Sequence, residues 1–352
     1  MPERYDVAII GAGHNGLVAA NYLARAGRKV AVLEARDVVG GACVSEELIP
    51  NSHWSSCAFI AGLLRPEIVR ELELNRFGLE MYQSDVLSFS LFRDGSHMFL
   101  HRELDMTLRE IERHSPKDAP RFIEFGARLK RFADLATPWL LQPPPTRSEV
   151  LRKFEEAGEE QLFNEFVLLS TRDLLDRYFE SEHLKGLLTF FGMVSIWGGP
   201  STPGTAYVYG HHSWGEFNGH FGQYGFVKGG MGGITLALAN AARAHGVEVR
   251  TGSPVDSLLV ENGKARGVRL VGGDEIVADT VISNADPKRS LLRLVDPGDL
   301  DADFRGAVES IDQRGSMARV HLLIDELPAY LGFDSSEGIQ HHGHQMLGAS
   351  VE

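Results

Sequence analysis

The fold is decided near the start of the chain, where residues 5–16 are Tyr-Asp-Val-Ala-Ile-Ile-Gly-Ala-Gly-His-Asn-Gly. The apolar run before the glycines is typical of a strand that is buried on both faces of a parallel sheet. Gly11, Gly13 and Gly16 follow it in the spacing G-x-G-x-x-G. Apolar residues then recur at helical spacing from Leu17 onward, so a helix is predicted directly after the glycine turn.

The glycines of this turn suit the binding of a dinucleotide. Gly11 permits a tight turn, Gly13 lets a pyrophosphate approach the backbone, and Gly16 lets the helix pack close to the sheet. His14 and Asn15 begin the helix, whose free N–H groups and positive dipole end favour phosphate. A glycine-rich turn that binds nothing is the alternative, and the strand–turn–helix context argues against it.

A second strand is predicted from Lys29 to Glu34, and it ends in an acid. Glu34 lies about 20 residues after the turn, where a carboxylate can accept hydrogen bonds from ribose hydroxyls. The chain continues as Glu-Ala-Arg-Asp-Val-Val-Gly-Gly over residues 34–41. Gly40 and Gly41 allow another close approach of backbone, which suggests a cofactor longer than NAD. An ordinary Gly-Gly turn is the alternative.

Composition and charge exclude several classes of protein. The chain has 352 residues, 43% of them hydrophobic, which fits a soluble globular protein of about two domains. Its net charge of −13 repels phosphate backbones, so no nucleic acid partner is expected. Cys43 and Cys57 are too few for a disulfide framework or a four-cysteine zinc site, and no CxxC occurs. With no targeting or transmembrane segment in the sequence, a cytoplasmic location is expected.

The motifs resemble those of the FAD-dependent phytoene desaturase-like and amine-oxidase-like flavoproteins. The resemblance rests on residues 11–20, Gly-Ala-Gly-His-Asn-Gly-Leu-Val-Ala-Ala, and on residues 34–41. A second block supports it, from Lys-Gly-Gly-Met-Gly-Gly at 228–233 to Val-Ile-Ser-Asn-Ala-Asp-Pro at 281–287. Shorter matches between residues 179 and 204 resemble one subgroup of this family.

The resemblance implies an α/β fold, in which a Rossmann-like FAD-binding domain with a parallel sheet and βαβ units is interleaved with an α+β substrate domain. The FAD-binding domain would comprise residues 1–60 and 228–290, and the substrate domain residues 61–227 and 291–352. Related flavoproteins are longer and end with a glycine-rich closing segment. No such segment follows here, so we expect the C-terminal part of the family to be missing.

The resemblance also implies roles toward FAD for single residues. The glycine turn would hold the pyrophosphate, Glu34 would hold the adenosine ribose, and Val255 would contact adenine through its backbone. Relatives among the amine oxidases often have Arg directly after the Gly-Gly pair; Ala42 stands there in this chain, which puts one phosphate contact in question. The predicted FAD-binding residues are Gly11, Gly13, His14, Asn15, Gly16, Glu34, Ala35, Arg36, Gly40, Gly41 and Val255.

The implied function is that of an FAD-dependent oxidoreductase of the desaturase or dehydrogenase type. It would remove hydride from an apolar, isoprenoid-like or lipid-like substrate, pass the electrons to oxygen or a quinone, and make peripheral contact with a membrane. The flavin carries such chemistry without a strong acid or base, so no catalytic residue is assigned. One alternative is a truncated or non-catalytic FAD-binding fragment or subunit. Another is an NAD-dependent dehydrogenase, which the pair at residues 40–41 disfavours.

A segment in the middle of the chain is almost free of charge. Between Lys185 and Lys228 the only charged residue is Glu216, and aromatic residues are dense. These aromatic side chains could line an apolar cavity that faces the flavin. They could equally form the core of a sheet, which the alternation at residues 207–209 would suit.

Histidines in and after this segment are candidate titratable groups. His211, His212 and His220 could move a proton, although hydrogen-bonded structural histidines are favoured. For the cluster at residues 341–344 a solvated tail is favoured over a metal site. Cys43 is predicted to be a small buried side chain rather than a covalent link to flavin.

Helices are predicted over 104–114, 120–136, 148–156 and 159–178, with a stiff break at 143–145 and a further strand over 318–325.

Overall fold

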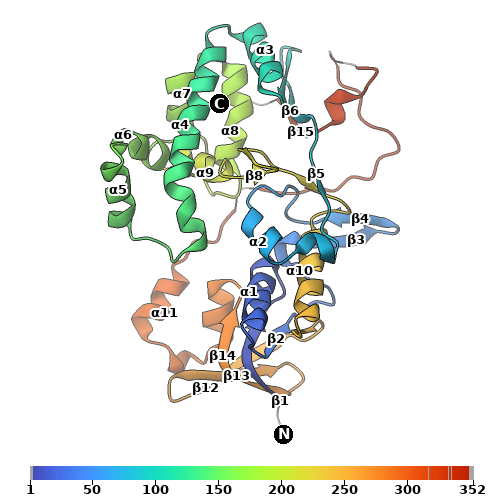
Figure 1. Cartoon of the computed structure of the whole chain (residues 1–352), viewed down its shortest axis with the longest axis vertical. Helices are drawn as coiled ribbons and strands as arrows, with labels where there is room; N and C mark the ends of the chain where they lie inside the picture. The colour runs from blue at the N-terminus through green and yellow to red at the C-terminus, as the bar shows by residue number, and fades with distance from the viewer. Residues whose placement is uncertain (1–2, 316, 332, 334, 349–352) are drawn as a thin grey trace. The chain divides into compact units, whose positions relative to one another are not determined.

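The computed structural model describes residues 3–315, 317–331, 333 and 335–348. The chain divides into two compact units, which Figure 1 shows together. The first unit comprises Met1–Tyr82 and Phe226–Gln313, and the second comprises Gln83–Gly225 and Arg314–Glu352. Both units are therefore discontinuous in sequence.

The first unit is built on a six-stranded sheet in the order β11-β2-β1-β14-β13-β12. Four strands are parallel to one another, namely β1 (Glu3–Ile10), β2 (Val30–Leu33), β11 (Glu248–Arg250) and β14 (Glu275–Ser283). β12 (Val255–Glu261) and β13 (Lys264–Leu270) extend the sheet as antiparallel strands. The predicted parallel sheet with a βαβ start is confirmed.

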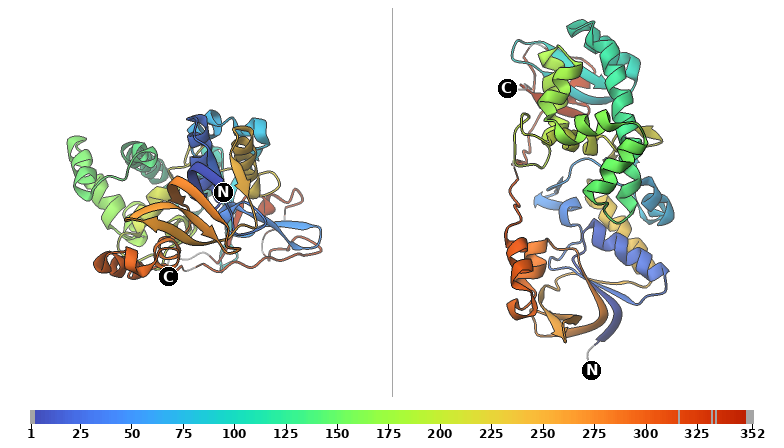
Figure 2. Two further views of the ribbon diagram at one scale, coloured as in Figure 1. Left: turned by 90° about the horizontal axis from the view of Figure 1, so that it is seen from below. Right: turned by 90° about the vertical axis from the view of Figure 1, so that its left-hand side faces the viewer.

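Helices α1 (His14–Arg25) and α10 (Gly232–Ala244) lie on the same side of this sheet, as Figure 2 shows. Their apolar side chains share a core with Val30 and Val32 of β2. Ala31 and Leu33, which alternate with these two, belong to a separate core on the other face. A strand that is buried on both faces must be apolar throughout, which is why the sequence pattern predicted β2.

The first unit extends past residues 60 and 290 because later apolar side chains complete its two cores. Leu72 and Leu74 are fully buried in the core of α1 and α10, and Leu294 packs in the core on the opposite face. That each unit serves a separate function stays a prediction. The remaining α-helices and strands of this unit are β3 (Ser45–Ile49), β4 (Ser52–Ser55), α2 (Pro66–Glu71), β5 (Met81–Tyr82), β10 (Phe226–Val227) and α11 (Ala302–Glu309).

The second unit combines helices with a small sheet, as the predicted α+β class requires. In its three-stranded sheet, β6 (Val86–Leu91) lies between β7 (His97–His101), to which it is antiparallel, and β15 (His344–Leu347), to which it is parallel. A short hairpin pairs β8 (Glu216–Phe217) with β9 (His220–Phe221). The helices are α3 (Leu104–His114), α4 (Asp118–Ala136), α5 (Arg147–Glu156), α6 (Glu160–Phe163), α7 (Thr171–Tyr178), α8 (Glu182–Met193) and α9 (Thr205–His212).

The predicted single helix over residues 159–178 is wrong. The chain instead forms α6, a π-helical turn over Asn164–Leu168, and then α7. Leu169 is extended, and the Ser170 side chain accepts a hydrogen bond from the backbone N–H of Asp173. A serine in that position caps the start of a new helix. The apolar periodicity is the same on both sides of this boundary, so periodicity alone predicted one continuous helix.

The predicted strand over residues 318–325 is also wrong. None of the described strands pairs with this segment, and Val320 and Leu322 are 77% and 69% exposed. A strand needs a neighbour with which to exchange backbone hydrogen bonds, however apolar its sequence is.

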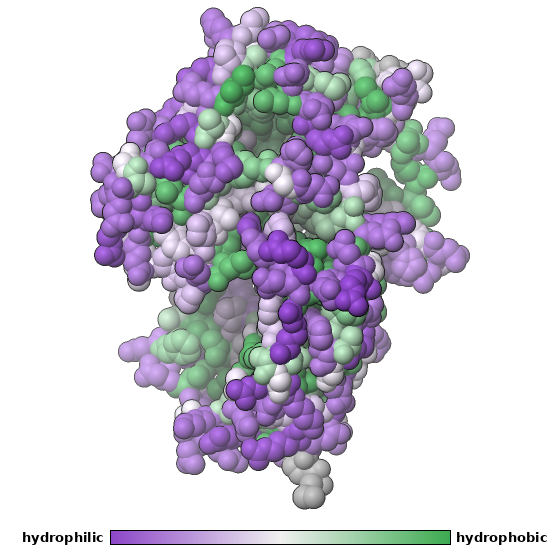
Figure 3. Space-filling model, viewed as in Figure 1, coloured by the Kyte–Doolittle hydropathy of each residue, from purple (hydrophilic) through white to green (hydrophobic). Residues whose placement is uncertain are grey.

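On the face drawn in Figure 3, hydrophobic side chains form small patches within a mainly hydrophilic surface. No helix among the described residues is both long and apolar enough to cross a bilayer.

Candidate dinucleotide-binding site

The glycine turn lies at the carboxyl end of β1, between two parallel neighbours. Gly11 has a φ of 97°, in the left-handed region that favours glycine. Gly13 is the N-cap of α1, and no side chain caps this helix end. The first N–H groups of the helix, including those of His14 and Asn15, are therefore available as donors beside the positive end of the helix dipole. This combination suits an anion such as a phosphate.

The turn leaves no room for side chains on Gly13 and Gly16. A Cβ on Gly16 would lie 2.4 Å from the carbonyl oxygen of Gly11, and a Cβ on Gly13 would lie 2.8 Å from Asn284 Nδ2. Carbon atoms do not approach non-bonded heavy atoms that closely, so neither position can carry a side chain without a shift of its neighbour. The resulting bare backbone beside a helix N-terminus is what a dinucleotide pyrophosphate requires, so the residues present fit such a cofactor.

The predicted second glycine pair lies directly beside the first turn. The backbone N–H of Gly40 donates to the carbonyl of Ala12 at 2.9 Å, and Gly13 and Gly40 form an isolated parallel bridge. Gly41 has a φ of 54°, and a Cβ on it would lie 3.1 Å from the Cα of Gly13. The two glycine loops therefore form one continuous cradle of bare backbone.

Glu34 is fixed at the edge of this cradle by hydrogen bonds to both of its carboxylate oxygens. Oε2 accepts from the backbone N–H of Ala12 at 2.8 Å, and Oε1 accepts from that of Arg36 at 3.0 Å. The residue is only 9% exposed, whereas Ala35 beside it is exposed. Each oxygen of a carboxylate has a further lone pair, so both can also accept from the hydroxyls of a ribose.

Two further predicted residues lie around Glu34. The guanidinium of Arg36 forms an ion pair with Glu46 of β3. Val255 begins β12, and the loop before it is tied to the site because the backbone N–H of Ser253 donates to the carbonyl of Glu34 at 2.8 Å. The structure thus brings together the two glycine loops, Glu34 and the loop that precedes Val255.

His14 and Cys43 meet at the side of the cradle, with His14 Nδ1 3.6 Å from Cys43 Sγ. Burial lowers the pKa of the His14 imidazole, and burial also raises the pKa of the Cys43 thiol. Both groups are therefore neutral near pH 7, and the pair is not a reactive thiolate–imidazolium pair. The prediction that Cys43 is a small buried side chain is confirmed, since it is 8% exposed.

One residue of this edge, Asn284, was missing from the predicted set. It follows the last residue of β14, and its backbone N–H donates to the carbonyl of Ile10 at 2.8 Å. Its side-chain amide lies over the glycine turn. The available signal was its place at the end of a strand, because the carboxyl ends of neighbouring parallel strands meet at the same edge.

Residues 207–209 of the aromatic-rich segment form part of a helix, so their interpretation as part of a sheet core is wrong. These residues belong to α9, where Tyr209 is buried in the helical core of the second unit together with Trp214. Trp197, by contrast, is 58% exposed. The other interpretation, an apolar cavity facing the flavin, stays a prediction.

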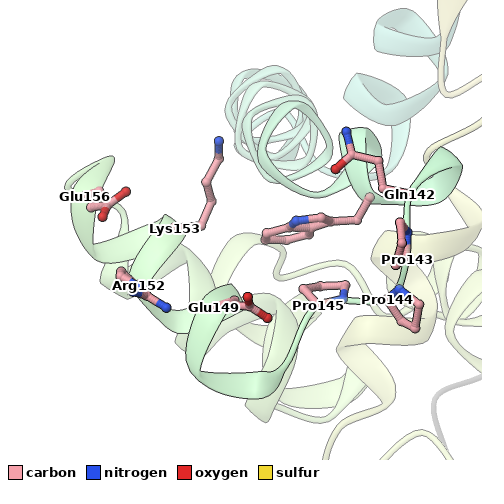
Figure 4. A pocket seen from close by; sticks show the side chains of 9 residues that line it. Gln142, Pro143, Pro144, Pro145, Glu149, Arg152, Lys153 and Glu156 are labelled. Carbon is pink, nitrogen blue, oxygen red and sulfur yellow. The ribbon is translucent and has the colours of Figure 1, made fainter.

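A groove of about 570 Å³ lies on the second unit, where the proline run meets α5 (Figure 4). Its lining residues are Trp139, Gln142, Pro143, Pro144, Pro145, Glu149, Arg152, Lys153 and Glu156. The charged side chains among them come from successive turns of α5. Sites for apolar ligands are lined mainly by hydrophobic side chains, so this groove does not suit an apolar substrate.

Of the candidate histidines, His212 has a structural role and His220 is exposed. His212 Nδ1 donates to the carbonyls of Val208 at 3.0 Å and Phe191 at 3.1 Å, and His220 is exposed. The predicted solvated tail at 341–344 is wrong for its last residue, because His344 begins β15 and is paired with β6. In the part of the chain that the structure describes, no group of three or more His, Cys, Asp or Glu could hold a metal ion.

Acidification is expected to destabilise the wild-type protein more than the variant His212→Asn. Burial lowers the pKa of His212, although its two backbone hydrogen bonds oppose this. A lowered pKa means that the unfolded chain binds the proton more readily, so stability is full above the unfolded pKa and falls as the pH drops below it. Asn keeps a donor near the position of Nδ1 and does not titrate.

The measurement is urea unfolding of both proteins at about pH 7.5 and about pH 5.5, on either side of the ordinary histidine pKa. His211, whose pKa burial also lowers, titrates in both proteins and leaves a residual slope. Equal losses of stability in the two proteins would contradict the expectation.

The sheet, the glycine cradle and the acid after the second strand define a dinucleotide-binding α/β protein. The family model described as flavin containing amine oxidoreductase matches residues 16–339. The chain belongs to this family, as its motifs predicted. The cofactor of its dinucleotide-binding fold is FAD.

Three relatives and one solved structure illustrate the similarity. Rat pyridine nucleotide-disulfide oxidoreductase domain-containing protein 2 is 33% identical over 97% of this chain and 64% of its own length. A subunit of the limonene dehydrogenase of Castellaniella defragrans is 26% identical over 96% and 63%. The zeta-carotene-forming phytoene desaturase of Myxococcus xanthus is 29% identical over 83% and 55%.

The solved structure is a redesigned putrescine oxidase, which superposes with a TM-score of 0.53 and 22% identity over 84% of this chain and 61% of that one. At this identity the likeness concerns the fold alone. The chain spans less than two thirds of the length of each of these four proteins.

Proposed function

We propose that this chain holds FAD in the glycine cradle and acts in an oxidoreductase of the desaturase or dehydrogenase type. The observation that carries the proposal is the joining of the two glycine loops through Gly13 and Gly40, beside an uncapped helix N-terminus. When bound, a flavin supplies the capacity to accept a hydride. The residues of the chain then have to hold it, orient it and keep water away.

Each predicted residue has a role in this proposal. The backbone N–H groups of His14 and Asn15 donate to the diphosphate, and the bare backbone of the two glycine loops lets it approach. Glu34 accepts hydrogen bonds from the adenosine ribose, with Ala35 and Arg36 beside it and the backbone of Val255 at the adenine. The geometry of Glu34 supports this, since two backbone N–H groups already orient its carboxylate.

The substrate that we propose is an apolar molecule, isoprenoid-like or lipid-like. Two relatives are named for limonene and phytoene, and both names refer to apolar hydrocarbons. We further propose oxygen or a quinone as the electron acceptor, peripheral contact with a membrane, and a cytoplasmic location. The free thiols of Cys43 and Cys57 are consistent with a reducing compartment.

A second candidate is an FAD-binding subunit without activity of its own. It is favoured by the name of one relative, which describes a subunit. In this case the cradle would still hold FAD, but substrate oxidation would require another polypeptide.

The test begins with the visible spectrum of the purified chain after incubation with FAD and removal of excess cofactor. We expect a stoichiometric flavin band that is bleached by dithionite. Phytoene or limonene in detergent micelles is then added without oxygen. Bleaching by either substrate supports the oxidoreductase, and retained FAD with no bleaching favours the subunit. A soluble, folded chain that retains no FAD contradicts both.

A further inference from the structure

Asn284 occupies the space above all three glycines of the turn. Its Nδ2 atom lies 2.8 Å from the position of a Cβ on Gly13, 3.2 Å from that on Gly16 and 3.9 Å from that on Gly11. The residue reaches this place because β14 runs parallel to β1, with Ser283 opposite Ile10. Asn284 is therefore the first residue past the strand end, at the level of the glycine turn.

The side-chain amide of Asn284 makes no hydrogen bond with any other residue that the structure describes, whereas its backbone N–H is used to extend the ladder onto Ile10. Asn284 is a partly exposed residue, so it is not enclosed in the core of the unit. A primary amide has two N–H donors, and here they are placed next to the uncapped N–H groups that begin α1. Donors that converge beside a helix N-terminus suit an anionic group.

We propose that Asn284 is a phosphate-binding residue, whose Nδ2 donates a hydrogen bond to the diphosphate of the cofactor. This inference rests on the proposed function, which assigns the diphosphate to the same turn. The amide then has a double role, because it also lies against Gly13 and limits how far the turn can move. The requirement for glycine at position 13 comes from this neighbour as well as from the cofactor.

A charge at this position separates a phosphate contact from simple packing. Asn284→Asp keeps the size and shape of the side chain but replaces its donor with a carboxylate that repels a diphosphate. Asn284→Ala removes the donor without adding charge. Loss of one hydrogen bond to a charged group predicts about a tenfold rise in the Kd for FAD in the alanine variant, and repulsion predicts a rise of about 100-fold or more in the aspartate variant.

The experiment titrates the apo forms of the wild type and both variants with FAD and follows the quenching of flavin fluorescence. Asn240→Asp is the matched control, since it adds the same charge on the exposed side of α10 in the same unit. Displacement by ADP and by adenosine is measured in parallel. We expect Asn284→Asp to weaken the binding of ADP but not that of adenosine, because only ADP carries a diphosphate.

The affinities of the two variants for FAD, compared with that of the wild type, decide whether the inference holds. If Asn284→Asp binds FAD as the wild type does, the side chain only packs against the turn and the inference is overturned. Should the alanine variant fail to fold, the isosteric aspartate variant and its ADP selectivity still give the answer. Absence of FAD binding by the folded wild type would overturn the proposed function and this inference together, and the two failures are thereby distinguished.

Discussion

Replacing Glu34 with alanine is expected to raise the Kd for FAD by at least about 100-fold, because hydrogen bonds to a charged group contribute about 1.5–3 kcal/mol each. The carboxylate holds the backbone N–H groups of Ala12 and Arg36 and has free lone pairs for two ribose hydroxyls. The substitution removes these acceptors and leaves the N–H of Ala12 without its partner inside the turn. The measurement is titration of apo protein with FAD, with affinity read from flavin fluorescence.

Asp37→Ala is the control for this experiment. This substitution also removes one negative charge from the loop after β2, but Asp37 is exposed and is not part of the predicted set. The affinity of this variant for FAD is expected to stay within about twofold of the wild type, as for a surface substitution of less than about 0.5 kcal/mol. If Glu34→Ala binds FAD as tightly as this control, the carboxylate does not hold the ribose.

Replacing Glu165 with alanine is expected to reduce the free energy of unfolding of the second unit by about 3 kcal/mol, as for other buried ion pairs that lose one partner. Glu165 lies in the π-helical turn and is 3% exposed. Its carboxylate accepts from Arg128 Nη2 and from Gln161 Nε2, each at 2.9 Å. Without it, the half-buried guanidinium of Arg128 loses its buried partner.

The unfolding free energy is measured with urea, following circular dichroism and tryptophan fluorescence. Arg177→Ala is the matched control on the same carboxylate, because its Nη1 is 3.7 Å from Glu165 Oε1 and its side chain is 49% exposed. A pair of that kind contributes less than about 1 kcal/mol. Equal losses in the two variants would mean that the buried network does not stabilise this unit.

The fold of the first unit could be predicted wherever the pattern of apolar and polar residues within one short segment was enough to define a strand or a helix. Residues 7–10 of β1 and all of β2 are buried, so each is a short, continuously apolar run bounded by glycine or charge. The helix α3 likewise has the predicted bounds, 104–114, because its apolar and charged residues alternate with a clear helical period. Periodicity does not mark boundaries within an apolar stretch, which is why the break at Ser170 was missed.

Two other errors concern segments whose structure depends on a distant partner. Residues 318–325 have the composition of a buried strand, yet no described strand lies beside them to complete a ladder. His344 was predicted to be solvated, but it belongs to β15, which pairs in parallel with β6. Neither outcome is encoded in the local pattern, since pairing is decided by what the rest of the chain offers.

The sequence by itself determined the class of this protein. The spacing of Gly11, Gly13 and Gly16 between a strand and a helix, with Glu34 after the next strand, requires a bare backbone turn and a ribose-binding acid, because sterics and hydrogen bonding act over short distances along the chain. Only the tertiary structure decided that Gly40 joins this turn and that Asn284 stands over it. Those contacts arise from the parallel order of β2, β1 and β14, which brings together ends of strands that lie far apart in the sequence.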